Sequence, residues 1–242
     1  MRVSRTFKAL ALAGAVLFAP SLASAATLSY QVPGNIFGTN GSAGVHISSP
    51  LSVNAQAGGF ALKGDISGDS ALESFTAWCV DITKSINLGY SYTVTNTPFA
   101  NGSGVMNSTQ IGNIQKLFNT ALTGLNLTNA ANSAGFQLAL WELVYETGAT
   151  FNVSSGGFAA TSGNAGAITV ANSLLAGLLG PKTGNYTLSF LESYRHGSQN
   201  LVTGTPGKDE IPPVPVPAAG LLLFSALGGA GLMSRLRRRA TA

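Results

Sequence analysis

Residues 136–143 read FQLALWEL, and this stretch decides the fold. One glutamine and one glutamate interrupt it; otherwise it is apolar on nearly every side, unlike a surface helix with one apolar stripe. The longer segment from Asn132 or Ser133 to Thr147 has the length of a helix, and Gly148 suits the position just after a helix end. We therefore expect a helix that is buried on most sides by other elements.

Strand patterns lie on both sides of this helix in the sequence. The expected strands are residues 27–32, 59–66, 74–82, 90–95, 186–192 and 199–202, separated by Gly, Asn and Pro clusters. Two further helices are expected, one capped by Ser108 and one from about Ala165 to Leu179. This order predicts an α+β fold: a mostly antiparallel, β-sandwich-like sheet with two or three inserted helices.

The N-terminus has the pattern of a secretory signal peptide. Three basic residues precede an apolar run from Ala9 to Phe18, and the small residues of 21–25 follow. Cleavage is expected after Ala25, because the basic, apolar and small-residue regions occur in the order of a signal peptide and the apolar run is too short for an anchor. Residues 1–25 are thus a signal peptide and residues 26–202 the exported domain.

The C-terminus has the pattern of a membrane anchor. Residues 203–213 form a Gly, Pro and charge-rich linker, and about 20 uncharged residues follow from Val214 to Ser234, enough to span a bilayer. A basic tail follows, formed by Arg235, Arg237, Arg238 and Arg239. Basic residues remain on the cytoplasmic side, so the domain is expected outside the cytoplasmic membrane, with which the chain associates at least transiently.

The charge of the chain is concentrated at its ends. The net charge is +4, but three basic residues lie in the signal peptide and four in the tail. The remaining six Lys and Arg residues face all nine Asp and Glu residues, so the part between the ends carries −3. This excludes a basic surface for nucleic acid. Charged residues make up only 9% of the chain, which favours an extracellular β-rich domain over a cytoplasmic enzyme.

The tail also resembles a known family of sorting signals. Its proline motif is Val214-Pro215-Val216-Pro217-Ala218, followed by the short apolar span and the basic cluster. This arrangement resembles the VPxPA variant of PEP-CTERM tails, which exosortases process in Gram-negative bacteria. The resemblance implies an exosortase-type processing enzyme as a partner and release to the cell surface or the extracellular matrix. The Glu between prolines that names the main family is absent here.

Two blocks suggest a reactive site. They are residues 75–82, FTAWCVDI, with the single cysteine Cys79, and residues 136–143 with Gln137. The pair resembles the blocks of surface thioester domains, in which a Cys thiol and a Gln carboxamide condense with loss of ammonia. The resemblance implies that Cys79 supplies the sulfur and Gln137 the acyl carbon, in an environment formed by Trp78, Asp81, Phe136 and Trp141.

Elementary chemistry agrees with this interpretation. A thiol is the strongest side-chain nucleophile, a buried helix would hold Gln137 rigidly, and Trp78, Phe136 and Trp141 would exclude water. The resulting thioester would acylate a protein amine or a polysaccharide hydroxyl once. The chain would then be a covalent adhesion or matrix-interaction protein, without a cofactor and not an enzyme in the ordinary sense.

Other interpretations remain open. Cys79 also fits a small buried hydrophobe, in a non-covalent structural component of an exopolysaccharide or biofilm matrix. Ser70 lies in a Gly-Asp-Ser-Ala-Leu block similar to the nucleophile block of GDSL-type esterases, but His196 lacks the aspartate that those enzymes place before it. His46 and His196 are too isolated for a zinc site, and Asp65, Asp69 and Asp81 lack the spacing of a calcium loop. No metal site is expected.

Overall fold

The computed structural model describes residues 25–96, 98–100, 104–148, 150–193 and 197–207. The chain divides into two units, Met1–Pro206 and Gly207–Ala242, and the folded domain is the first. The expected signal peptide, except for Ala25, and the expected sorting motif, apolar span and basic tail lie outside the described residues. Within the described ranges no helix has the length and apolar character needed to cross a membrane.

The described strands form two sheets and a short hairpin, and all their pairings are antiparallel. The larger sheet has the strand order β1-β7-β11-β12-β6-β5-β2. Its strands are β1 (Ala25–Thr27), β7 (Ser91–Thr95), β11 (Tyr186–Glu192), β12 (Leu201–Pro206), β6 (Glu73–Cys79), β5 (Phe60–Gly64) and β2 (Ser29–Tyr30). The smaller sheet consists of β10 (Ala159–Ser162), β3 (Ser42–Ser49) and β4 (Val53–Gly58), and the hairpin of β8 (Phe99–Ala100) and β9 (Gly104–Val105).

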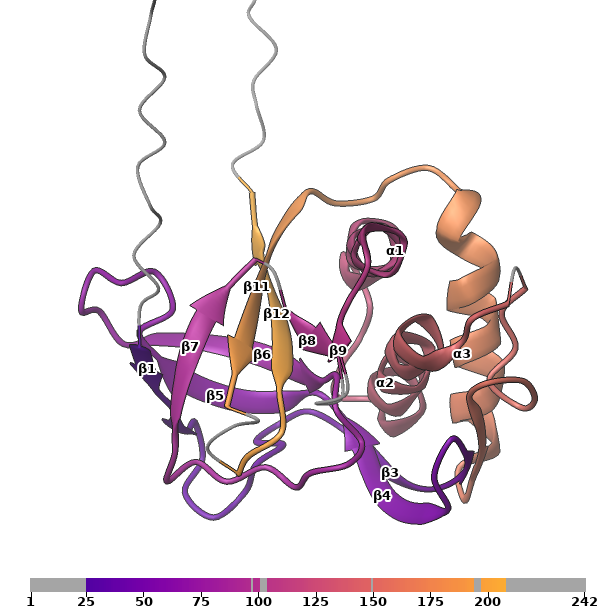
Figure 1. Cartoon of the computed structure of the whole chain (residues 1–242), viewed down its shortest axis with the longest axis horizontal. Helices are drawn as coiled ribbons and strands as arrows, with labels where there is room; N and C mark the ends of the chain where they lie inside the picture. The colour runs from indigo at the N-terminus through magenta and orange to yellow at the C-terminus, as the bar shows by residue number, and fades with distance from the viewer. Residues whose placement is uncertain (1–24, 97, 101–103, 149, 194–196, 208–242) are drawn as a thin grey trace, which may run out of the picture. The chain divides into compact units, whose positions relative to one another are not determined.

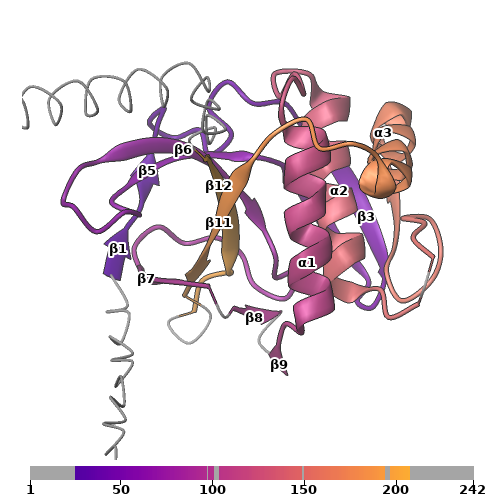
Figure 2. The same ribbon diagram turned by 90° about the horizontal axis from the view of Figure 1, so that it is seen from above.

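Three α-helices lie between β9 and β11 in the described sequence, each capped by an asparagine side chain. They are α1 (Ser108–Leu117), α2 (Ala130–Tyr145) and α3 (Ala165–Ala176), with caps Asn107, Asn129 and Asn164. A π-helical turn, Phe118–Leu122, continues α1, and a 3-10 turn, Gly177–Leu179, continues α3. Figures 1 and 2 show the helices gathered at one side of the larger sheet. The expectation of an α+β fold with mostly antiparallel sheets and inserted helices is confirmed.

Helix α2 is the central element of the core. Every residue from Ser133 to Val144 is buried, as its all-round apolar sequence predicts. It packs against α1, α3, β3, β4 and β6. Gly135 permits the close approach of α3, since a Cβ atom there would lie 2.6 Å from Val170 Cγ1.

The helix and strand boundaries differ from the expected ones in several places. Helix α1 is capped by Asn107 in a capping box with Gln110, and Ser108 is therefore its first residue rather than its cap. Helix α2 begins at Ala130, before the expected start, because the Asn129 side chain accepts from the Asn132 N–H. Strand β12 continues to Pro206, so the expected domain end at residue 202 falls within a strand that pairs with β11.

Candidate functional site: a cysteine between two glutamines

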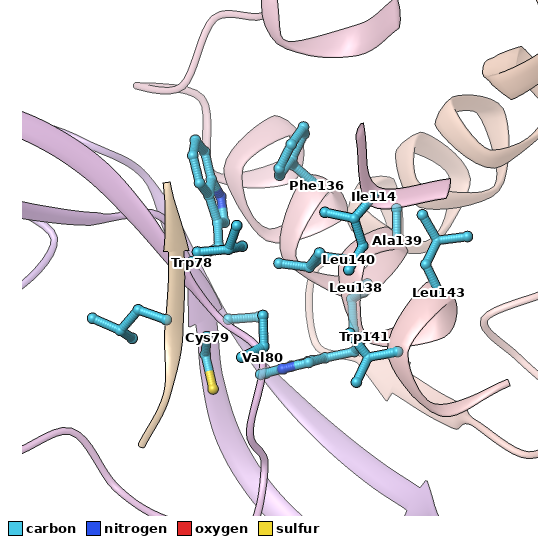
Figure 3. Packing of buried hydrophobic residues seen from close by; sticks show 14 of the residues in the cluster. Trp78, Cys79, Val80, Ile114, Phe136, Leu138, Ala139, Leu140, Trp141 and Leu143 are labelled. Atoms are coloured by element: carbon cyan, nitrogen blue, oxygen red, sulfur yellow. The ribbon is translucent and has the colours of Figure 1, made fainter. Parts of the chain in front are cut away.

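Cys79 is the last residue of β6, in the interior of the larger sheet. Its partner across the ladder is Leu201 of β12, and the next residue, Val80, donates its N–H to the Asn200 carbonyl oxygen at 3.0 Å. The side chain is buried, with 3% of its surface exposed, and forms no disulfide. Figure 3 shows the sulfur pointing away from Trp78 and Phe136, as expected for consecutive residues of a strand.

Gln137 binds the backbone of Cys79 from α2. Its Oε1 accepts the Cys79 N–H at 3.0 Å, and its Nε2 donates to the Cys79 carbonyl oxygen at 2.8 Å. The structure thus brings together the two residues singled out in the sequence. However, both polar atoms of the Gln137 carboxamide are used by the Cys79 peptide, so the hydrogen-bonded partner of the thiol is a different residue.

The Cys79 thiol faces Gln199, at the start of the segment that leads into β12. Sγ lies 2.9 Å from Gln199 Oε1 and 2.9 Å from the Asp81 carbonyl oxygen, and these two acceptors share its single proton. Gln199 is itself buried, with 6% of its surface exposed. Of the two glutamines, Gln199 is the one whose carboxamide contacts the sulfur, whereas the sequence had paired the sulfur with Gln137.

The chain around Gln199 is fixed by neighbours on both sides. The Gln199 N–H donates to the Ser85 carbonyl oxygen at 3.3 Å. Ser198 Oγ accepts the Asn87 N–H at 2.7 Å and is 2.6 Å from Tyr92 Oη. On the other side, Asn200 Oδ1 accepts the Ser193 N–H at 2.8 Å. These contacts hold the Gln199 carboxamide against the thiol.

Sequence reasoning missed Gln199 because its position is set by strand register. Residues 199–202 were expected only as a short strand, and the pattern around Gln199 carries no signal of chemistry. The pairing of Leu201 with Cys79 places Gln199 beside the sulfur. This juxtaposition joins residues 120 positions apart and depends on the order of strands in the sheet.

The residues of the predicted environment fall into two groups. Trp78 and Phe136 lie on the opposite side of β6 from the sulfur, where their ring centroids are 4.6 Å apart and both pack edge-on against Phe118. Trp141 and Asp81 belong to the sulfur side. Asp81 is fully buried; its Oδ1 accepts from Thr83 N and Oγ1, while its Oδ2 has no hydrogen-bond partner among the described residues.

Burial keeps the thiol protonated. It raises the pKa of Cys79 to about 12, and a hydrogen bond with the Asp81 backbone lowers the pKa only in part. The negative charge of Asp81 raises the pKa further, and the Trp141 indole lowers it. At neutral pH the sulfur is therefore a hydrogen-bond donor to Gln199 rather than a free thiolate.

A cavity of about 450 Å³ leads to the sulfur. Cys79, Gln137, Trp141 and Gln199 line it. Its apolar wall consists of Ile36, Phe37, Leu51, Phe60, Ile82 and Ile86. The exposed residues Thr83, Lys84 and Ser85 also line it, so the cavity connects Cys79 and Gln199 with the surface. A slender side chain could reach the sulfur through this cavity.

The other candidate residues lie elsewhere or serve as turn residues. Ser70 is exposed in the β5–β6 turn, with φ of 69°, and its N–H donates to Asp65 Oδ2 at 2.9 Å. His46 lies on β3 and is hydrogen-bonded to Asn54 at 3.0 Å. His196 lies outside the described residues. Within the described ranges no group of three or more His, Cys, Asp or Glu side chains could hold a metal ion.

Comparison with known proteins adds a weak likeness. No family model matches the chain, and no curated protein matches it. Among solved structures the chain is similar to the N-terminal domain of the Streptococcus pyogenes pilus tip adhesin Cpa. The identity is 16%, the TM-score is 0.36, and the match covers 68% of this chain and 93% of that chain. This likeness is too low to support an inference about the site.

Proposed function

We propose that this chain is an exported surface protein that binds its target covalently through an internal thioester between Cys79 and Gln199. The observation that carries the proposal is the 2.9 Å contact between Cys79 Sγ and Gln199 Oε1, inside a buried and hydrogen-bonded frame. A thiol and a carboxamide held in contact have the proximity that makes an otherwise very slow acyl transfer feasible. Gln137 serves as the clamp on the Cys79 backbone.

The bond-forming step conserves all atoms. Cys79 Sγ attacks Gln199 Cδ, the Sγ–Cδ bond forms, and the bond from Cδ to Nε2 breaks. The thiol proton leaves with the amide nitrogen as ammonia, so no oxidant, reductant or cofactor is needed. Since the pKa of the thiol is about 12, the proton transfers within the site as the sulfur attacks, rather than being lost beforehand to solvent.

The thioester would then capture a nucleophile that enters the cavity. An amine attacks Cδ, the Sγ–Cδ bond breaks, and the proton released by the amine returns to the sulfur as the Cys79 thiol. The target remains joined to Gln199 through an amide bond. A protein amine is the better substrate because it is the stronger nucleophile; a polysaccharide hydroxyl would give an ester. Each molecule reacts once, so the protein is an adhesin rather than an enzyme.

Burial supports a stored thioester. Cys79, Gln137 and Gln199 expose 3%, 1% and 6% of their surfaces, respectively, and much of the cavity lining is apolar. Water reaches the acyl carbon only through the cavity, which would slow hydrolysis until the target arrives.

Export and sorting complete the proposal. The signal-peptide pattern of residues 1–25 supports secretion, and the proline motif, apolar span and basic tail of residues 214–242 support processing by an exosortase-type enzyme. The domain would act at the cell surface or in the extracellular matrix of a Gram-negative bacterium, where covalent attachment withstands dilution and shear.

The test is a mass measurement on the full chain, purified without reducing agent. We expect the intact mass to fall short of the processed sequence by one ammonia, and the deficit to be absent in Cys79→Ala and in Gln199→Ala. Methylamine should add one molecule per chain and release one thiol, and peptide mapping should place the methylamide on Gln199. Attachment at Gln137 would refute the assignment, and a full mass in fresh protein would refute the thioester.

One observation favours a second function. The raised thiol pKa and the two acceptors beside Sγ also suit an inert buried cysteine, in a domain that binds matrix polysaccharide without a covalent bond. The same measurement distinguishes the two functions. A full mass with one thiol that becomes titratable only on unfolding would support the non-covalent component.

A further inference from the structure

Two tryptophan N–H groups are buried without an acceptor among the described residues. They are Trp78 Nε1 and Trp141 Nε1, on side chains that are 1% and 3% exposed. A buried donor without a partner costs about 1–3 kcal/mol, so such a group needs a structural or chemical reason. The two groups differ in position, and only one of them belongs to the reactive site.

Trp141 lies beside the reactive pair. It follows Gln137 by one turn of α2, so both side chains project from the same face of the helix toward the end of β6. Figure 3 shows the Trp141 ring extending from the helix toward Val80, with Cys79 next to it on the strand. Trp141 also lines the cavity with Cys79 and Gln199. Its N–H is outside hydrogen-bonding geometry, yet close enough to the Cys79 thiol to lower its pKa.

Trp78 provides the contrast. It precedes Cys79 on β6, points to the other side of the strand, and packs against Phe118 and Phe136. Its ring lines a different cavity, together with Phe75 and Tyr186. The chain therefore contains one buried indole N–H at the reactive pair and one away from it.

We propose that the Trp141 indole N–H stabilises the negative oxygen that develops on Gln199 during acyl transfer. This inference rests on the proposed thioester. When Sγ or an amine attacks Gln199 Cδ, the carbonyl becomes tetrahedral and Oε1 gains negative charge. In the resting state Oε1 is 2.9 Å from Sγ and accepts from the thiol. That donor disappears once the sulfur becomes bonded to carbon, and a second donor is then required.

Trp141 suits this task by its chemistry. Indole is a donor only, so it cannot compete for the proton of the thiol or of the amine. It is held at a buried position by helix α2, where a positioned donor is worth far more than in water. Because Nε1 is unpartnered at rest, its hydrogen bond to Oε1 would be gained at the transition state, which is the condition for accelerating the reaction.

The experiment compares two Trp→Phe variants of the full chain. Trp141→Phe and Trp78→Phe each remove one buried, unpartnered N–H and a similar volume. The readouts are the ammonia deficit, the second-order rate of methylamine attack followed by thiol release, and the thermal unfolding midpoint. A further variant replaces Trp141 with 3-benzothienylalanine, which keeps the ring shape and substitutes sulfur for N–H.

We expect folded Trp141→Phe and the benzothienyl variant either to lack the thioester or to react with methylamine roughly 10²-fold more slowly than wild type, as for loss of an oxyanion donor. Trp78→Phe should form the thioester and react at close to the wild-type rate. A benzothienyl variant with a full thioester and a methylamine rate within about twofold of that of Trp78→Phe would overturn the role of Trp141. Failure of the proposed function is distinct, since wild type itself would then show no deficit.

Discussion

The Gln137 carboxamide and the Cys79 peptide form a closed pair of hydrogen bonds, at 3.0 Å from the Cys79 N–H and 2.8 Å to its carbonyl oxygen. A side-chain amide here takes the place of a neighbouring strand. The pair joins α2 to β6 and fixes the direction in which the Cys79 side chain leaves the sheet. The thiol consequently lies against Gln199 rather than against the helix.

The first prediction concerns this clamp. Gln137→Ala leaves the buried N–H and carbonyl of Cys79 without partners, and each should cost about 1–3 kcal/mol of unfolding free energy. Chemical denaturation should show a loss of roughly 2–6 kcal/mol. Both variants are made in a Cys79→Ala background, which cannot form the thioester; there Gln199→Ala, the matched control, leaves the clamp intact and should lose less. Equal stability of Gln137→Ala and the Cys79→Ala parent would contradict the role of Gln137 as the clamp on the Cys79 backbone.

The pairing of Cys79 with Gln137 was predicted from the resemblance of their two sequence blocks to those of surface thioester domains. The all-round apolar pattern of the helix predicted only that Gln137 would lie on a buried helix. The local sequence pattern could not predict the role of each glutamine, because that role depends on which side-chain atoms face the sulfur in the folded chain. Gln199 follows the described end of β11 and reaches the site only through the register of β12 on β6.

The elements were predictable to a similar degree. Strand β11 spans Tyr186–Glu192 as expected, because its alternation is regular. Strand β3, Ser42–Ser49, was not predicted, although Ala43, Val45 and Ile47 alternate with exposed residues. Its apolar residues are small or few, and the strand pairs with β4 and with the distant β10 while packing against α2.

The second prediction concerns the reactivity of the free thiol. In Gln199→Ala no thioester can form, and burial should still hold the pKa of Cys79 far above its usual range. The folded variant should react with iodoacetamide at neutral pH roughly 10³-fold more slowly than an exposed cysteine, because the thiolate fraction is that much lower. Unfolding in urea should restore the ordinary rate. Fast labelling of the folded variant would contradict the buried, protonated thiol.

The third prediction concerns pH and the end of α2. Burial raises the pKa of Glu142 to about 7, and its Oε1 accepts the Asn152 N–H while Oε2 has no partner among the described residues. The folded state keeps the proton at a pH where the unfolded state has lost it. Stability should therefore fall as pH rises from about 4.5 through 7, by on the order of 2 kcal/mol. Glu142→Gln should remove this dependence and be the more stable protein above pH 7.

Glu146, one turn further along the chain, is the control for this measurement. Its carboxylate accepts from the backbone N–H groups of Thr147, Gly148 and Gly157, which lowers its pKa. Glu146→Gln should remove a stabilisation that is lost as pH falls, opposite in sign to Glu142. Denaturation midpoints measured from pH 3 to 8 separate the two. An unchanged pH profile in Glu142→Gln would show that Glu142 does not carry the effect.

The fourth prediction concerns the segment that presents Gln199. Ser198 Oγ accepts the Asn87 N–H at 2.7 Å and lies 2.6 Å from Tyr92 Oη, so Ser198→Ala leaves two buried or partly buried groups without this partner. We expect a loss of about 1–3 kcal/mol in stability. Thioester content, measured as the ammonia deficit, should fall at a temperature where the variant is still folded, because the carboxamide is no longer held against the thiol. Tyr92→Phe keeps the bond from Asn87 to Ser198 and should retain more thioester. A full deficit in folded Ser198→Ala would show that the pairing with Leu201 alone suffices to position Gln199.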